Sequence, residues 1–194
     1  MGRNLTPDSI IRKAMSGDTQ AFRAIVEDHQ DFVFSVAHRF VNNARDAEDL
    51  TQETFLRLWK NLSRYKSEIK LTTWLYKIVT NVCLDYLKSK QYRHNAMEEG
   101  LDKGHQVSAS ANADQSVIDG ELRSLLIRAA ETLTPKQKAV FVLRDLEGLD
   151  VSEVTEVLHM SAGNIKSNLC HARKRIGDII KQYYSQVKSR NHEM

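Results

Sequence analysis

Apolar residues recur at spacings of three and four along most of this 194-residue chain, a pattern that predicts amphipathic helices. The first half carries four such stripes, and each follows residues that can start a helix. In chain order these starts are Thr6-Pro7, with Gly17 just past the helix end, then Asp18, Asp46, and Thr72 or Thr73. The four helices are expected to form a bundle over residues 1–92.

A polar stretch interrupts this pattern between Arg93 and Gln115, with few aromatic residues and no helical stripe. Such a composition is typical of a flexible linker between domains, which we place at residues 93–118. Helical spacing then returns, and no strand signal of comparable quality occurs. The sequence therefore predicts an all-α protein with two helical domains, at residues 1–92 and 119–194.

Capping signals divide the second domain into helices. A first helix from Pro135 is expected to stop near Gly148, a short helix covers 151–158, and a longer helix follows a turn at 159–161. The residues that can cap these helices are Thr134 with Gln137, Asp150 with Glu153, and Ser161.

The last two of these helices form a helix-turn-helix, the strongest motif in the sequence. In the second helix one stripe is apolar and is expected to be buried: Ile165, Leu169, Ala172 and Ile176. The opposite side carries polar and basic residues, namely Lys166, Ser167, Cys170, His171 and Lys174, with Arg173 at its border. This is the layout of a recognition helix in the major groove of DNA, and the alternative is an ordinary hairpin in a helical bundle.

The charge distribution separates these alternatives better than the formal net charge of +3. Five acids and no base lie between Asp145 and Glu156, whereas four bases and no acid lie between Asn164 and Ile176. Such a reversal indicates one face for a polyanion and another turned away from it, although a solvated charged surface has the same signature. With the tight turn, it favours DNA.

The composition is that of a soluble folded protein, with 41% apolar and 27% charged residues. No run of about 18 apolar residues occurs, and the N-terminus lacks the apolar core of a signal peptide. The two cysteines have no metal-ligand spacing. A reduced, cytoplasmic protein without membrane insertion is the expectation.

An acidic stripe on the third helix of the first domain combines Asp46, Asp49 and Glu53, with Gln52 beside them. Three interpretations are open: a solvated face, a site for a hard cation, or a docking surface for a basic partner. One helix cannot surround an ion, and no histidine or further acid stands at a helpful offset.

The fourth helix also has two different sides. Leu75, Val79, Val82 and Tyr86 form an apolar stripe, and the other side carries Trp74, Lys77, Asn81, Asp85 and Lys88. An aromatic ring, an amide and lysines suit single-stranded DNA, because they can stack on a base, read its edge and follow the backbone. Trp74 alone could equally belong to the core.

No nucleophile–base pair, phosphate loop or ligand cluster stands out, and the seven histidines are scattered. We therefore expect no catalytic residues, no metal and no cofactor. A metal-dependent nuclease using the acids of residues 46–53 is a rival, and it predicts turnover that is lost on Glu53→Ala.

The segment LTPKQKAVFVLRDLEGLDVSEVTEVLHMSAGNIKSNLCHARKRI (133–176) resembles the promoter-binding domain of extracytoplasmic-function (ECF) sigma factors, which binds the upstream (−35) element. The resemblance implies DNA contacts by the exposed recognition-helix residues above and by Arg144. The sequence departs from the family at His159, where a turn glycine is usual, and at Asn164 and Asn168, which replace the usual Thr and Arg.

Two segments of the first domain are also similar to this family. DAEDLTQETFLRLWKNL (46–62) matches the motif that binds the clamp helices of the largest polymerase subunit, which implies that Asp46, Asp49, Gln52 and Glu53 form the polymerase-binding set. TTWLYKIVTNVCLDYLKSK (72–90) resembles the segment that melts the downstream (−10) element, and the match assigns Asn81 to a captured base. With the preceding loop, Ser63 to Lys70, the implied downstream contacts are Tyr65, Trp74, Lys77, Asn81 and Lys88.

The resemblance implies an initiation factor that binds core RNA polymerase at its clamp helices and flap region. It would hold double- and single-stranded promoter DNA, melt the start site without nucleotide hydrolysis, and be held inactive by an anti-sigma factor. The rival in the same class is a stand-alone helix-turn-helix regulator, which predicts tight specific binding to duplex DNA without polymerase.

Overall fold

The computed structural model describes residues 6–98 and 125–190, and these residues form helices and no strands, which confirms the all-α class. The helices of the first half are α1 (Asp8–Met15), α2 (Thr19–Val41), α3 (Ala44–Asn61), the 3₁₀ turn η1 (Leu62–Arg64) and α4 (Leu71–Glu98). The second half begins with a short helix over residues 125–131. It is followed by α6 (Pro135–Phe141), the π-helical turn η2 (Val142–Leu146), α7 (Val151–Leu158) and α8 (Ala162–Arg190).

Helix starts in the first half follow the local capping chemistry. Asp18 caps α2 as predicted, because its carboxylate accepts the N–H groups of Gln20 and Ala21. The other starts differ from the prediction by one or two residues. In α1, Pro7 occupies the N-cap itself, and the hydroxyl of Thr6 donates to Asp28 of α2 instead of capping the helix.

The third and fourth helices begin earlier than predicted, whereas α1 begins one residue later. Asn43 caps α3, where its side chain accepts the N–H of Asp46 at 3.0 Å, so the helix begins at Ala44 and not at Asp46. Helix α4 begins at Leu71 and continues to Glu98, past the predicted domain end at residue 92. Six residues of the predicted linker are therefore helical, and the rest of it lies outside the described residues.

Caps in the second half agree with the sequence. Thr134 with Gln137 and Asp150 with Glu153 each form a complete capping box, and the hydroxyl of Ser161 accepts the N–H of Asn164. A hydrogen bond from Ser152 to Asp150 lowers the pKa of that carboxyl.

Two left-handed residues make the turns around α7. Gly148 has φ of 73°, and His159 adopts φ of 51° at the position where the resemblance leads us to expect a glycine. A histidine tolerates this conformation at some energetic cost.

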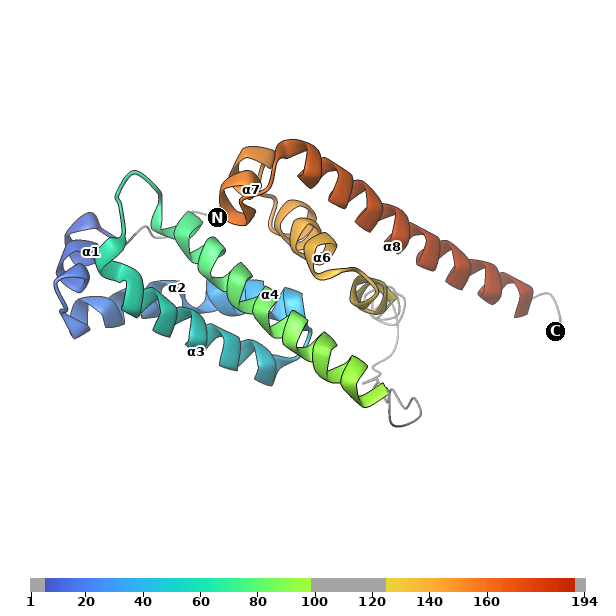
Figure 1. Cartoon of the computed structure of the whole chain (residues 1–194), viewed down its shortest axis with the longest axis horizontal. Coiled ribbons are helices and arrows are strands. Elements are labelled where there is room, and N and C mark those ends of the chain that lie inside the picture. The colour runs from blue at the N-terminus through green and yellow to red at the C-terminus, as the bar shows by residue number, and fades with distance from the viewer. Residues whose placement is uncertain (1–5, 99–124, 191–194) are drawn as a thin grey trace.

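One continuous hydrophobic core runs through both halves of the chain. Helix α4 lies between α1–α3 on one side and α6 and α7 on the other (Figure 1), and it contacts α2, α3, α6 and α7. The fully buried side chains include Phe40, Leu58 and Leu75 from the first half and Leu143 and Ile165 from the second. The two predicted helical domains thus pack directly on each other, which the sequence did not predict.

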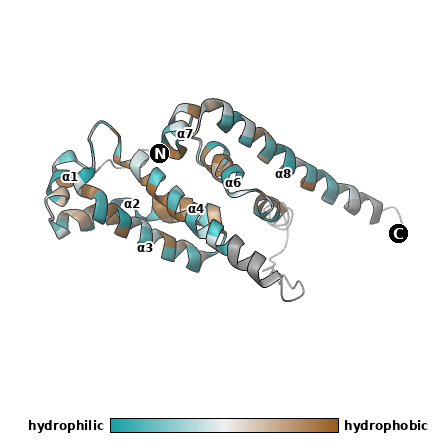
Figure 2. Cartoon of the chain, in the orientation of Figure 1, coloured by the Kyte–Doolittle hydropathy of each residue, from teal (hydrophilic) through white to brown (hydrophobic). Residues whose placement is uncertain are grey.

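Helix α8 extends beyond this core, and Figure 2 shows mostly hydrophilic residues along it. Its first part packs on the helix over residues 125–131 through a smaller cluster that includes Ala129, Leu133, Ala172 and Ile176. Within the described ranges, no helix is both long enough and apolar enough to cross a membrane.

Candidate nucleic-acid interface

The α7–α8 hairpin has the two-sided character that the sequence predicted. All four residues of the apolar stripe in α8 are buried, among them Ile165 and Ala172 at 0% exposure. The polar side of the helix is open to solvent, and every predicted contact on it is exposed: Lys166, Ser167, Cys170, His171, Arg173 and Lys174. The hairpin therefore presents a contiguous basic and polar helix face to a partner.

Arg173 is held by an acid of the preceding segment. Its Nε and Nη2 atoms donate to the two carboxylate oxygens of Asp145 at 2.8 and 2.6 Å. This hydrogen-bonded pairing raises the pKa of Arg173 and fixes one edge of its guanidinium. Asp145 therefore orients a predicted DNA contact, which the sequence did not reveal because the two residues stand 28 positions apart.

Arg144 is placed differently from the other predicted upstream contacts. It is half-buried, its Nη1 donates to the backbone carbonyl of Leu149, and its Nε is buried and has no hydrogen-bond partner among the described residues. The structure thus ties Arg144 into the loop before α7 and does not bring it onto the exposed face of α8.

The acidic stripe on α3 is partly exposed and partly engaged. Asp49 and Gln52 are exposed, whereas the carboxylate of Asp46 accepts the hydroxyl of Tyr86 at 2.8 Å. Glu53 accepts Nε of Arg57 at 2.7 Å. The predicted polymerase-binding set therefore lies on one helix, with Asp49 and Gln52 as its most accessible members.

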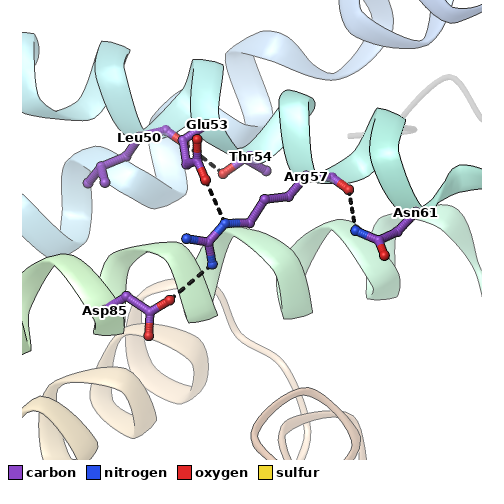
Figure 3. Close-up of polar contacts among 6 residues, drawn as sticks. All are labelled: Leu50, Glu53, Thr54, Arg57, Asn61 and Asp85. Atoms are coloured by element: carbon purple, nitrogen blue, oxygen red, sulfur yellow. Dashed lines mark hydrogen bonds and ion pairs between the residues drawn. The ribbon is translucent and has the colours of Figure 1, made fainter.

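Arg57 joins this stripe to helix α4, as Figure 3 shows. Its Nη1 donates to Asp85 of α4 at 3.0 Å, and the hydrogen bonds to Glu53 and Asp85 raise the pKa of Arg57. A carboxylate paired with a guanidinium is a poor metal ligand. No group of three or more His, Cys, Asp or Glu side chains that could hold a metal occurs in the part of the chain that the structure describes. The nuclease alternative gains no support.

The predicted downstream contacts lie on α4 and on the loop before it. Asn81 and Lys88 are exposed, and Lys77 and Trp74 are half-buried. The ring of Trp74 lies 5.3 Å from that of Tyr65, centroid to centroid, and burial raises the pKa of Tyr65. Trp74 therefore contributes to the core and still reaches the surface.

A cavity of about 220 Å³ opens beside these two rings. We name it the Tyr65–Trp74 groove, and its first-half lining includes Arg64, Tyr65, Lys66, Trp74 and Lys77. Two aromatic rings flanked by three cations are the components of a site for single-stranded nucleic acid.

A second hollow, of about 540 Å³, lies between α2 and α3. Leu56 at its edge is 53% exposed, an unusual exposure for a leucine. Leu56 lies outside the apolar stripe of α3. An apolar residue at such a position is the sequence signal that could have revealed the hollow. The remaining lining includes Phe22, Val26, Gln52, Phe55 and Trp59. Because Gln52 lines it, the hollow adjoins the acidic stripe.

Family models match both halves of the chain. The model for Sigma-70 region 2 matches residues 25–93, and that for Sigma-70 region 4 matches residues 123–176. Together the two matches cover more than half of the chain.

Curated relatives cover almost all of it. An ECF RNA polymerase sigma-E factor of Escherichia coli (strain K12) is 27% identical over 186 residues, which are 93% of this chain and 97% of that protein. The ECF RNA polymerase sigma factor SigE of Mycolicibacterium smegmatis is 32% identical over 164 residues, 84% of this chain and 63% of that longer protein.

Two solved structures show the same fold. CnrH, in complex with the cytosolic domain of CnrY, superposes with a TM-score of 0.63 at 20% identity, covering 91% of this chain and 98% of CnrH. The sigma factor RpoE of Bartonella quintana, in complex with the anti-sigma factor NepR, gives a TM-score of 0.59 at 18% identity, covering 82% and 96%. Because models for two sigma-70 regions match in order and an ECF relative matches over 93% of the chain, the chain belongs to the sigma-70 family, within the ECF group of sigma factors.

Proposed function

We propose that this protein binds core RNA polymerase, directs it to specific promoters and melts the downstream element to initiate transcription. The observation that carries the proposal is the exposed polar face of α8 opposite a fully packed stripe, in a segment that matches Sigma-70 region 4. Such a protein works where polymerase and chromosome are, in the cytoplasm.

Upstream recognition is assigned to α8. Lys166, Arg173 and Lys174 supply cations that can neutralise phosphates and release counterions, which gives binding that weakens with salt. Ser167, Cys170 and His171 lie between them and can approach base edges in the major groove. The recognition helix thus combines positioning by phosphate contacts with sequence reading by short polar side chains.

Polymerase binding is assigned to α3, whose accessible acids and Gln52 suit a basic helical partner. The adjoining apolar hollow with Leu56 at its edge offers such a partner hydrophobic contact as well. A docking surface with an apolar centre and a charged rim has the usual anatomy of a protein–protein interface. The clamp helices are the proposed partner here, and the second half would contact the flap region.

Melting is assigned to α4 and the Tyr65–Trp74 groove. Unstacking a base costs a few kcal/mol, and the cost must be offset by contacts to the extruded base and its strand. Stacking on an aromatic ring contributes about 1–3 kcal/mol per base, and Lys77 and Lys88 can follow the backbone. Asn81, exposed on the same helix, is proposed to read the captured base. Binding energy alone then opens the duplex, and no nucleotide hydrolysis is needed.

An anti-sigma factor is a further proposed partner. CnrH and the Bartonella quintana RpoE were both solved with a protein bound, and the latter partner is named as an anti-sigma factor. A stand-alone regulator is not favoured, because residues 25–93 match a polymerase-associated sigma region and not a sensing or dimerisation domain.

The proposal is tested by transcription in vitro with core polymerase on genomic DNA fragments, with the 5′ ends of the transcripts mapped. We expect discrete start sites that require this protein and that share an upstream and a downstream sequence element. Transcripts equal to those of core polymerase alone would contradict the proposal.

A further inference from the structure

The π-helical turn η2 lies between α6 and the helix-turn-helix, and it holds an acid against the recognition helix α8. The turn is closed by a hydrogen bond from the N–H of Glu147 to the carbonyl of Val142 at 2.9 Å. Val142 and Leu143 are buried, at 1% and 0% exposure, so the inner side of the turn is anchored in the core. Turns of this kind are rare in proteins and are often found at functional sites. Here the turn carries Asp145, whose carboxylate reaches Arg173 of α8.

The pair of Asp145 and Arg173 has a defined geometry. Both carboxylate oxygens accept a hydrogen bond, one from Nε at 2.8 Å and the other from Nη2 at 2.6 Å. The side chain of Asp145 is 20% exposed and that of Arg173 is 60% exposed, so the acid is largely covered while the guanidinium faces solvent. A planar guanidinium that donates two hydrogen bonds to one carboxylate is held in a single orientation. The pair therefore fixes the direction of the remaining N–H groups of Arg173 before any DNA is bound.

Arg173 lies on the same side of α8 as two other predicted DNA contacts. Lys166 precedes it by seven residues, about two helical turns, and Cys170 precedes it by three. All three residues are exposed. Arg173 thus stands at one end of this row, where a contact to a phosphate would fix how the helix lies along the groove.

The acid next to this face needs a physical account. A carboxylate repels phosphates, so by its charge alone Asp145 lowers the affinity for DNA of any sequence. An arginine with free rotamers can reach several phosphates and stabilises many alignments of protein and DNA, whereas an arginine held in place reaches a phosphate in one alignment. Ordering the side chain before binding also removes part of the entropic cost of that one contact. The pair therefore favours one alignment over the others.

We propose that Asp145 is a positioning residue for upstream recognition. It holds Arg173 in the orientation that fits one register of α8 on the promoter, and it thereby raises the discrimination between the upstream element and unrelated DNA. The inference rests on the proposed function, because it takes upstream DNA as the ligand of α8. Asp145 acts through Arg173 and does not itself contact the DNA, so its loss should reduce selectivity more than affinity.

The test compares Asp145→Asn, which keeps the shape and removes the charge, with Asp178→Asn, the same change at an exposed acid of α8. The assembled holoenzyme is titrated by fluorescence anisotropy with two fragments: a promoter located by transcription, and a copy with a scrambled upstream element. We expect Asp145→Asn to reduce the ratio of the two affinities by about two- to tenfold, which is the advantage of one side chain ordered before binding. Asp178→Asn should leave the ratio unchanged. An unchanged ratio in Asp145→Asn would overturn the proposal.

A second background separates positioning from repulsion. In Arg173→Ala, the further change Asp145→Asn should shift both affinities by the same factor, because the side chain that Asp145 positions is gone. A fall in the ratio that persists without Arg173 would show that Asp145 acts by its own charge, and the proposal would be wrong. Circular dichroism checks folding. If Asp145→Asn is unfolded, Arg173→Lys takes its place: it keeps every charge but cannot form the two-bonded pair, so it must lower the ratio.

The orientation itself is tested without DNA or polymerase. Exchange of the Arg173 Nε–H proton with water, followed by nuclear magnetic resonance, should be about two- to fivefold faster in Asp145→Ala, because an exposed ion pair gives protection of that size. Equal exchange rates would remove the pairing on which the proposal depends. If the unchanged holoenzyme bound both fragments equally, upstream recognition itself would fail. Selectivity that is present in the unchanged protein and intact in Asp145→Asn would overturn only this inference, so the two failures are distinguishable.

Discussion

Two arginines of α8 that differ by two positions provide a matched test of the recognition face. At about 100° per residue, Arg173 and Arg175 point roughly 200° apart around the helix. Arg173 is paired with Asp145 at the border of the predicted DNA face. Arg175 is also exposed, but its Nε donates to Thr132 Oγ1 at 3.3 Å, toward the helix over residues 125–131. Replacing either by alanine removes the same charge from opposite sides of the helix.

The size of the effect follows from the geometry of Arg173. Asp145 holds Nε and Nη2, so the remaining N–H groups on the Nη atoms are left for DNA, and the position of Arg173 at the border of the face fits a phosphate contact. Arg173→Ala should therefore weaken promoter binding about 5- to 30-fold, the lower part of the range for an arginine that contacts DNA. The slope of log affinity against log salt should fall by about one. The pair with Asp145 is exposed, so the unfolding midpoint should hardly change.

The assay is binding of the assembled holoenzyme to a promoter fragment identified by transcription, measured by fluorescence anisotropy over a salt series. Arg175→Ala should bind within about twofold of the unchanged protein, since a distant surface charge acts weakly at this ionic strength. Equal losses in the two variants would show that general charge and not this face binds the DNA. Normal affinity in Arg173→Ala would mean that the helix is oriented differently.

Two further predictions concern the other surfaces, and a third concerns a buried thiol. Asp49→Lys with Glu53→Lys should abolish co-purification with core polymerase, because the docking stripe becomes basic; unchanged recovery would remove that assignment. Asn81→Ala should impair open-complex formation, read by permanganate, more than closed-complex binding, read by band shift; equal losses would contradict base capture. Burial raises the pKa of Cys83 to about 12, while the thiol of the unfolded chain ionises near 8.5. The folded chain then holds the extra proton, so the free energy of unfolding should fall by up to about 1.4 kcal/mol per pH unit as pH rises from about 9 toward 12. Cys83→Ala should reduce this alkaline loss in denaturant titrations, and an identical pH profile would refute the assignment.

Local chemistry made the helices predictable. The two capping boxes, the cap at Asp18 and the helix over 151–158 all occur where the sequence placed them, because each depends on residues within one turn. The starts of α1, α3 and α4 were displaced by one or two residues, and in α3 the reason is that the neighbouring Asn43 also offers a good cap. Side-chain spacing also identified the exposed face of α8, because a single amphipathic helix determines it.

Contacts between the two halves could not be read from the sequence. Tyr76, Thr80 and Cys83 have the right spacing for a buried side, but a tyrosine and a threonine there are equally compatible with a solvated surface. Glu147 appeared only as one acid in a run, and its partner Arg39 stands 108 positions away. Pairings at such separations depend on how complete elements pack, and no local pattern encodes them.

Strand separation at a mapped promoter is the measurement closest to the central claim. On a linear fragment without nucleotides, we expect thymines just upstream of the start site to become reactive to permanganate only when both this protein and core polymerase are present. Unreactive thymines with both present, or the same reactivity with either one alone, would contradict the account.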